Sequence, residues 1–170
     1  PKPKYRCLVW ACPAHYYTNF TYWTQHCWGV TCVNDMEAML SYLPISTDNK
    51  DQALADLVRC YERMMMRSHT NGGYVNLLDE CWKMCEKFNV NIVIMYDHVS
   101  CKNVGGLHGL FEDQARERGI HLIWIPHDVM DPRTVSRREM REAFNQYMTT
   151  VLREEPLDPT LLDYEDNLSW

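Results

Sequence analysis

Short apolar runs along the chain predict four β-strands. The runs cover residues 5–11, 28–33, 91–96 and 121–125. Residues 92–95 are four apolar residues in succession, which is typical of a parallel strand covered on both faces. The third run is followed by a polar stretch and by Gly105, Gly106 and Gly109, which favour a tight crossing from strand to helix.

Apolar residues at intervals of three and four predict the helices between these strands. Helical patterns cover residues 18–25, 51–66, 74–88, 107–118 and 136–153. Ser136 and Glu139 form an S-x-x-E capping box at the start of the last helix. The polar segment 67–73 is expected to be a loop, with His69 in solvent. In the second helix, the apolar residues at these intervals are Leu54, Leu57, Val58, Tyr61, Met64 and Met65. The three consecutive methionines, 64–66, favour packing at a helix end or an interface with a partner chain.

Strands that alternate with helices predict an α/β fold with a parallel sheet and right-handed crossovers. We expect four strands in the flavodoxin-like order 2-1-3-4, with helices on both faces. That order brings the loops 12–17 and 97–101 together at the switch point, where ligands bind in open parallel sheets. Tyr16 and Tyr17 in the first loop are therefore candidates to face a pocket.

The expected domain comprises residues 1–153, followed by an acidic tail, 154–170, that contains two prolines. We expect the tail to lie on its own domain or on a neighbouring subunit, with Leu161, Leu162 and Trp170 as apolar anchors. The sequence does not begin with methionine, and it predicts the carboxyl-terminal part of a larger subunit.

Composition excludes several classes of protein. A chain of 170 residues with 46% hydrophobic and 24% charged residues is an ordinary globular chain of one domain. A net charge of -6 argues against binding to a nucleic-acid backbone. No apolar run approaches the roughly 20 residues that a membrane span needs. We therefore expect a soluble, cytoplasmic protein.

The eight cysteines include no Cys-x-x-Cys pair, so a zinc ribbon or finger is not expected. Cys81 and Cys85 share one helix face and are predicted to lie in the core. Cys101 follows the third strand, where chemistry is common in parallel sheets. From position alone, a reactive thiol and a buried structural thiol are both open readings of Cys101.

Two stretches carry a resemblance to a known family. They are Asp97-His98-x-x-Cys101-Lys102, ahead of the glycine-rich helix start, and the segment 115–148, which includes Asp131-Pro132-Arg133. Their succession resembles the carboxyl-terminal domain of the cluster-bearing subunits in the benzoyl-CoA reductase and 2-hydroxyacyl-CoA dehydratase family. His121 stands where that family usually has proline.

The resemblance implies a 4Fe-4S cluster held by three cysteines. Cys101 matches the position of one cluster ligand, and the other two ligands lie outside this chain. Asp97 and His98 would then surround the cluster sulfur or act in catalysis. Cys12, after the first strand, is expected near the cluster but not as a ligand.

Within the family, the sequence of the last two segments and the acidic tail is most similar to that of a subunit of ATP-dependent benzoyl-CoA reductase. This resemblance implies electron transfer at low reduction potential, in which a separate ATP-hydrolysing activator passes single electrons to paired, homologous cluster-bearing subunits. These reduce the aromatic ring of an acyl-CoA thioester to a cyclic diene, and the isolated domain is expected to be inactive. The alternative within the family is an (R)-2-hydroxyacyl-CoA dehydratase, which uses a ketyl radical.

Two other classes stay open from the sequence. The domain could be a flavodoxin-like interaction module without enzymatic activity, because its glycines form no phosphate-binding loop. A hydrolase using Cys101, His98 and Asp97 is disfavoured, because the G-x-[SC]-x-G context of such nucleophiles is absent.

Overall fold

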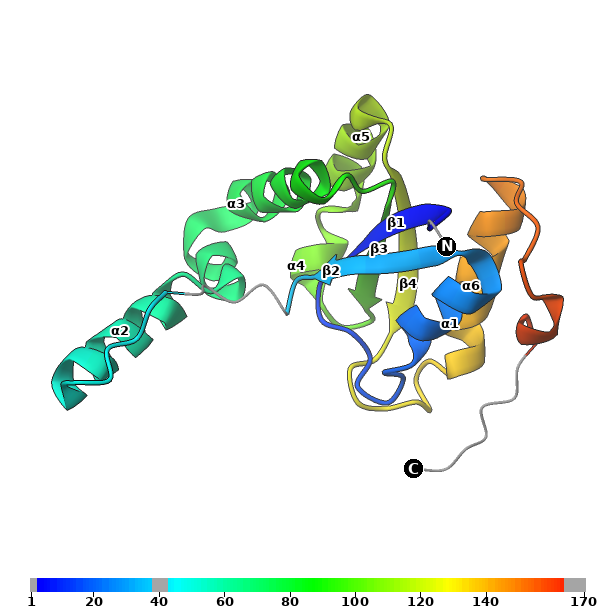
Figure 1. Cartoon of the computed structure of the whole chain (residues 1–170). Helices are drawn as coiled ribbons and strands as arrows, with labels where there is room; N and C mark the ends of the chain where they lie inside the picture. The colour runs from blue at the N-terminus through cyan, green and yellow to red at the C-terminus, as the bar shows by residue number, and fades with distance from the viewer. Residues whose placement is uncertain (1–2, 38–42, 164–170) are drawn as a thin grey trace.

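Four parallel strands form the centre of the molecule in a computed structural model, which describes residues 3–37 and 43–163 (Figure 1). The strands are β1 (Tyr5–Trp10), β2 (Val30–Asp35), β3 (Ile92–His98) and β4 (His121–His127). The helices are α1 (Phe20–Trp28), α2 (Lys50–Glu62), α3 (Met65–Phe88), α4 (Lys102–Gly105), α5 (His108–Arg118) and α6 (Arg137–Thr150), followed by the 3-10 turn η1 (Pro159–Leu161).

The sheet has the order β2-β1-β3-β4, and all its pairings are parallel. This confirms the predicted α/β fold and strand order. β3 pairs with β1 from the Cys7–Ile92 position and with β4 from Ile92–His121 to His98–His127. The carboxyl ends of β1 and β3 therefore lie next to each other, as the order 2-1-3-4 requires.

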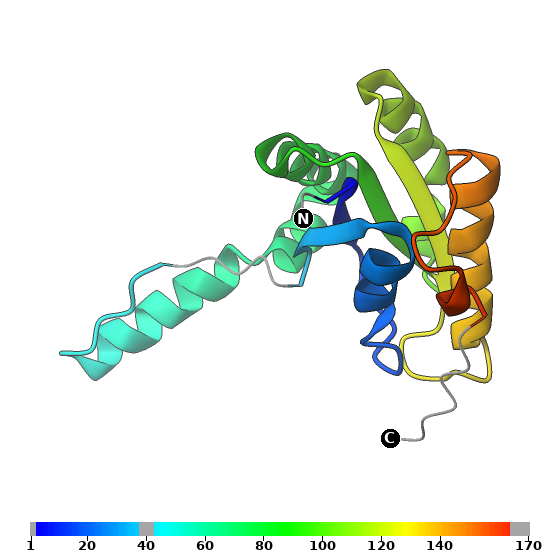
Figure 2. The ribbon, with the colours of Figure 1, turned by 45° about the vertical axis from the view of Figure 1, so that its right-hand side comes forward.

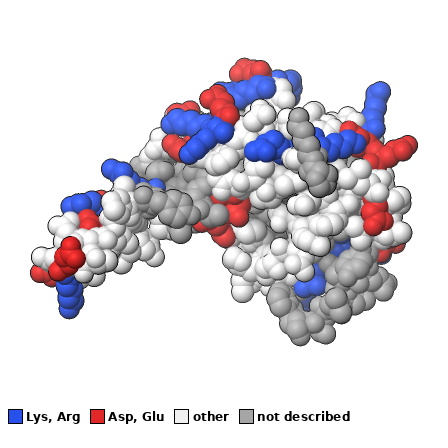
Figure 3. Space-filling model, in the orientation of Figure 1, with Lys and Arg blue, Asp and Glu red and all other residues white. Residues whose placement is uncertain are grey.

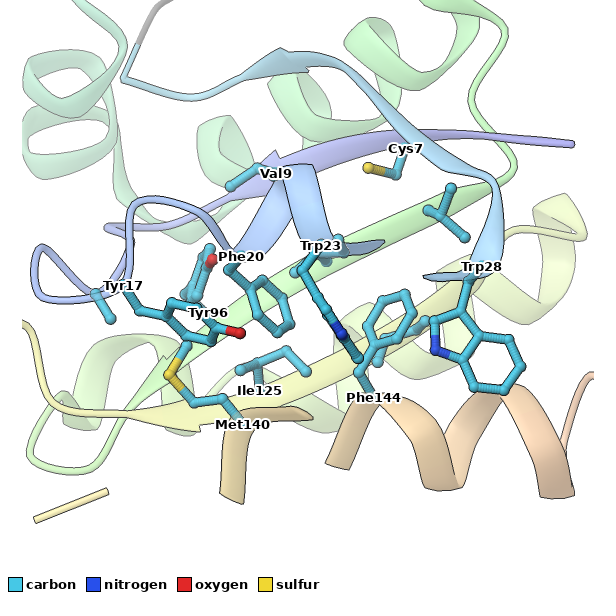
Figure 4. Close-up of a cluster of buried hydrophobic side chains, with 14 of the residues drawn as sticks. Cys7, Val9, Tyr17, Phe20, Trp23, Trp28, Tyr96, Ile125, Met140 and Phe144 are labelled. Atoms are coloured by element: carbon cyan, nitrogen blue, oxygen red, sulfur yellow. The ribbon is translucent and has the colours of Figure 1, made fainter. Parts of the chain in front are cut away.

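Helices α1 and α6 cover one face of the sheet (Figure 2). Phe20 and Trp23 of α1 pack against Phe144 of α6, with ring centroids 5.8 and 5.7 Å apart (Figure 4). Phe144 is completely buried. Burial of large aromatic side chains is the main source of stability on this face.

Helices α3 and α5 cover the opposite face. Cys81 and Cys85 of α3 are buried there, which confirms their predicted place in the core. Trp82 of α3 meets Phe111 of α5 edge to face, with centroids 5.8 Å apart. The indole of Trp82 also donates a 2.6 Å hydrogen bond to Gln114, so α3 and α5 are joined by apolar and polar contacts.

The ends of the strands differ from the predicted ranges. Trp28 closes α1 instead of opening the second strand, because Gly29 adopts the left-handed conformation (φ 70°) that ends a helix. β3 and β4 continue beyond residues 96 and 125 to His98 and His127. Asp97 and His98 thus belong to the end of a strand and not to the following loop.

Helix α2 extends away from the sheet in both views (Figures 1 and 2). Its sequence pattern predicted the helix correctly, but the apolar face that such a pattern usually buries is exposed here. Leu54, Leu57, Val58 and Tyr61 are between 45% and 64% exposed, and the side chain of Met65 lies outside the described part. The expected loop 67–73 is also wrong, because α3 already begins at Met65 and runs through it with a break at Gly73 (φ 72°).

The last helix and the residues after it pack on the α1–α6 face. Ser136 and Glu139 form the predicted capping box at the start of α6. Beyond α6, Leu161 and Leu162 pack against the core, and the carbonyl of Leu161 accepts a 2.8 Å hydrogen bond from the Trp23 indole. These contacts agree with the expected anchoring of the tail, whereas Trp170 lies outside the described residues.

Charged side chains of both signs are interspersed on the surface. Figure 3 shows Lys and Arg beside Asp and Glu along the edge over α3 and α5, with a mostly uncharged surface over β2 and α1. Within residues 3–37 and 43–163, none of the helices is long and apolar enough to cross a membrane.

Candidate functional site

A cavity of about 420 Å³ lies where the strands β1 and β3 end. The side chains that can take part in chemistry come from both strand ends and from α3 and α4; they are Cys12, His69, His98, Ser100, Cys101 and Asn103. The apolar wall includes Trp10, Met36, Leu77 and Val104. The cavity therefore occupies the predicted switch point, and it is an apolar chamber with a few polar groups, as ligand sites usually are.

Cys101 lies at the edge of this cavity, directly before α4, and is half-buried. Its amide donates a 2.8 Å hydrogen bond to the carbonyl of His98, and its carbonyl accepts one of 3.1 Å from Gly105. The turn that follows is close at Gly106, where a Cβ would lie 3.0 Å from the backbone oxygen of Lys102 and would require a small shift. The strand end and the short helix thus fix the backbone of Cys101 while its thiol borders the cavity.

His98 also lines the cavity, and its tautomer follows from its neighbours. The backbone N–H of Ser100 donates to Nδ1 of His98 over 3.1 Å, and the Ser100 hydroxyl lies 2.9 Å from the same atom. Because Nδ1 accepts a hydrogen bond, neutral His98 carries its proton on Nε2. His98 can therefore offer an N–H donor from a fixed ring.

Asp97 is directed elsewhere. Its Oδ2 atom lies 3.2 Å from Nε2 of His108, whose ring stacks on Trp124 with centroids 3.7 Å apart. Asp97 is not among the residues that line the cavity. Of the two residues expected around Cys101, the structure brings His98 to the cavity and places Asp97 against α5.

His127 forms a buried support behind His98. The two rings meet edge to face at 5.4 Å, and Tyr96 contacts His127 from 5.1 Å. His127 is completely buried, and among the described residues neither ring nitrogen has a hydrogen-bond partner. Burial, followed by the charge of His98, lowers the pKa of His127. The ring is therefore neutral at physiological pH.

Two residues of the cavity were missed by the sequence analysis. His69 was expected in solvent but is half-buried, with its ring centroid 5.6 Å from that of Trp10. Burial lowers the pKa of His69. Trp10 is 1% exposed, and neither its Nε1 nor Nε2 of His69 has a hydrogen-bond partner among the described residues. Trp10 could have been found because it ends a strand at the switch point, whereas nothing local identifies His69.

A second cavity, of about 230 Å³, continues from the first. The two share His69, Leu77 and Asn103 in their linings. The smaller cavity reaches the helix break at Gly73 and the start of α5 at Leu107. The two cavities therefore adjoin at His69, Leu77 and Asn103.

Tyr16 and Tyr17 do not face the cavity, so that expectation is wrong. Both are at most 5% exposed and belong to the α1–α6 core. The Tyr16 hydroxyl donates to the carbonyl of Val135, and Arg141 donates to the hydroxyl of Tyr17 over 3.0 Å. Their loop turns inward because burying two aromatic rings is more favourable than leaving them at an open edge.

Cys12 lines the main cavity together with Cys101, as its position after β1 predicted. Burial and a hydrogen bond to the Glu37 carboxylate raise the pKa of the Cys12 thiol to about 12. Iron–sulfur clusters bind thiolates, and Cys101 offers an accessible sulfur beside a cavity of sufficient size. The residues present therefore fit one ligand of such a cluster, with Cys12 nearby.

The fold and this cavity define an α/β domain with a ligand site at the carboxyl ends of parallel strands. Among curated proteins, none matches the chain. A family model described as "2-hydroxyglutaryl-CoA dehydratase, D-component" matches residues 1–148. The chain belongs to this family, whose members are subunits of multisubunit enzymes. The match confirms the family that the sequence resembles.

Proposed function

We propose that this chain is the Cys101-bearing domain of an iron–sulfur subunit that reduces an acyl-CoA thioester, of the ATP-dependent benzoyl-CoA reductase type. The observation that carries the proposal is the position of Cys101 at the edge of the apolar cavity between the ends of β1 and β3. A 4Fe-4S cluster bound through Cys101 would supply single electrons of low potential to a thioester in that cavity. ATP would act only through a separate activator.

The shape of the site supports an elongated, partly apolar ligand. The main cavity offers apolar side chains such as Trp10 and Met36, which suit an aromatic acyl group. The smaller cavity extends it past His69 toward Gly73, which suits the chain of a thioester. The presence of a second cavity next to the first is the reason for preferring an acyl-CoA over a small free acid.

His98 has the role of a donor in this proposal. Its Nδ1 is held by the Ser100 amide, so its Nε2–H is the group that can meet a carbonyl oxygen or a cluster sulfur. His127, which packs behind it, is neutral and adds no positive charge beside His98. Asp97 acts one step further away by holding His108 and the start of α5.

The second candidate is an (R)-2-hydroxyacyl-CoA dehydratase. It is favoured by the description of the matched family, which names a 2-hydroxyglutaryl-CoA dehydratase component. The same cavity and the same Cys101 would serve both reactions, so the substrate decides between them. In both, the domain works together with a homologous cluster-bearing subunit.

The test is the Cys101→Ser substitution in the complete enzyme, purified without oxygen together with its partner subunits. We expect the variant to lose iron, acid-labile sulfide and the broad visible absorbance of a cluster while its circular dichroism stays unchanged. Cys60→Ser is the matched control, because Cys60 is half-buried on α2 and does not line the cavity. Normal iron content in the Cys101 variant would overturn the proposal.

Substrate assays with ATP, activator and a low-potential donor separate the two candidates. Formation of a cyclic diene from benzoyl-CoA supports the reductase, whereas conversion of a 2-hydroxyacyl-CoA to an enoyl-CoA supports the dehydratase. His98→Gln should reduce kcat in either assay and leave the iron content unchanged, because the residue donates to the ligand and not to the metal.

A further inference from the structure

Three different metal-binding side chains meet at the rim of the main cavity, and Cys101 is not one of them. The ligand atoms of Cys12, His15 and Glu37 all lie within 4.8 Å of one another. Sγ of Cys12 is 4.0 Å from Nε2 of His15. We infer that these three residues form a binding site for a divalent metal ion of the zinc class.

The fold brings the three residues together from two adjacent strands. Cys12 and His15 belong to the loop after β1, and Glu37 follows the end of the neighbouring strand β2. The amide of Met36 donates to the carbonyl of Val9, which holds the two strand ends side by side. The site is therefore built on the sheet and not on one flexible loop.

The backbone of the loop is fixed on both sides of Cys12. Ala11 has a φ of 66°, a left-handed conformation that is uncommon for a residue with a side chain and costs energy. Ala14 is buried, and the amide of His15 donates a 2.8 Å hydrogen bond to the carbonyl of Val129. These contacts turn the Cys12 and His15 side chains toward the same point.

The separation of the Cys12 and His15 ligand atoms is close to that in a tetrahedral zinc site. Zn–S bonds of about 2.3 Å and Zn–N bonds of about 2.0 Å at tetrahedral angles place sulfur and nitrogen about 3.5 Å apart. The observed 4.0 Å needs only a small rotation, and His15 and Glu37 are exposed and can make it. Three protein ligands also leave a fourth position for water or another ligand.

The ligand types restrict the metal. A thiol, an imidazole and a carboxylate are the ligands of Zn²⁺ and its neighbours, whereas Mg²⁺ and Ca²⁺ prefer oxygen atoms alone. Because Cys12 also lines the main cavity, the bound ion would lie at its rim. Such an ion would add a positive charge next to the proposed thioester site, but its binding does not depend on the proposed function.

Co²⁺ is the probe, because its thiolate complexes absorb in the near ultraviolet and its tetrahedral complexes in the visible. The metal-free 170-residue chain, kept reduced and without oxygen, is titrated with Co²⁺ and then with Zn²⁺. We expect one equivalent of Co²⁺ to produce both absorptions and Zn²⁺ to displace it. Cys12→Ser should abolish the thiolate band, and His15→Ala should weaken Zn²⁺ binding by at least about tenfold.

Cys101→Ser is the matched control, because it removes the other thiol of the same cavity. It should leave the Co²⁺ spectrum unchanged, and a loss of the spectrum in this variant would place the metal at Cys101 and overturn the inference. Absence of any thiolate band in the unsubstituted chain, or its persistence in Cys12→Ser, would also overturn it. In those cases the three residues form only a hydrogen-bonded cluster.

Discussion

Among the described residues, the two faces of the sheet differ in whether all their tryptophan indoles are hydrogen-bonded. On the α1–α6 face, the Trp28 indole donates to Asn145 and the Trp23 indole to Leu161, each over 2.8 Å. On the other face, Trp82 and Trp124 are likewise paired with Gln114 and Glu112. At the cavity end of that face, Trp10 Nε1 and His69 Nε2 have no partner among the described residues.

This difference separates stability from function within one domain. A buried N–H without an acceptor is destabilising by about 1–3 kcal/mol, so a fold retains one most easily where a ligand completes it. On the α1–α6 face the aromatic rings are closely packed, and the indole N–H groups of Trp23 and Trp28 are both hydrogen-bonded. We therefore expect substitutions on the two faces to have different consequences.

The largest expected effect is on the α1–α6 face. Phe144→Ala removes a completely buried ring that contacts Phe20 and Trp23, and it should lower the free energy of unfolding by about 3–5 kcal/mol. Leu77→Ala, in the cavity wall, should cost about 2 kcal/mol, because that site already borders empty space. Urea denaturation of the isolated chain measures both, and equal losses would contradict the division between the faces.

A smaller effect is expected where the tail reaches the same face. Leu161 and Leu162 are half-buried against the core, and the amide of Leu157 donates a 2.7 Å hydrogen bond to Cys27. Replacing both leucines with alanine should lower the free energy of unfolding by about 2 kcal/mol, because two partly buried side chains lose apolar contact. In this double variant, amide hydrogen exchange should be faster in the tail than in α6. Unchanged stability and unchanged exchange would show that the tail contacts contribute nothing.

Most of the fold could be predicted because the signals are local. The unbroken run Ile92–Met95 identifies a strand covered on both faces, and alternation with helices predicts a parallel sheet, for which the flavodoxin-like order was the expected one. The same reasoning led to Cys101, His98 and Cys12, because strand ends meet at a switch point whatever the side chains are.

The rest could not be predicted because it depends on contacts distant in sequence. His69 enters the cavity only because α3 starts before it and brings it to Trp10. Tyr16 and Tyr17 turn inward to partners on and before α6, more than 100 residues away. Periodicity also could not tell that the apolar face of α2 has no sheet to pack on.

The third prediction concerns His127, the last residue of β4, which packs against Tyr96 of the α1–α6 core. Its pKa is lowered in the folded chain, so below about pH 6.5 the unfolded chain binds a proton that the folded chain excludes. Stability should therefore be fully present above that pH and be lost as the pH falls. His127→Gln should make the free energy of unfolding fall less steeply as the pH is lowered. Part of the pH dependence that remains comes from His69, whose pKa is lowered as well.

Urea titrations between pH 7.5 and about pH 5 measure this slope. His26→Gln is the control, because it makes the same substitution at a histidine that is exposed on α1. If the His127 variant keeps the full pH dependence, then protonation of another group causes the loss of stability.

The smallest effect is expected on α2, which contrasts with both faces of the sheet. Leu54 and Val58 are 53% and 57% exposed on a helix that extends away from the sheet. Replacing both with glutamine should change the free energy of unfolding of the isolated chain by no more than about 0.5 kcal/mol, because exposed positions lose little apolar burial and glutamine is a good helix former. Leu78→Gln on α3 is the matched comparison. Leu78 is 3% exposed, so the same substitution there buries an amide and should be destabilising by several times as much. A large loss in the α2 variant would mean that this helix packs on the domain in solution, and that its apolar stripe serves the core as the sequence pattern predicted.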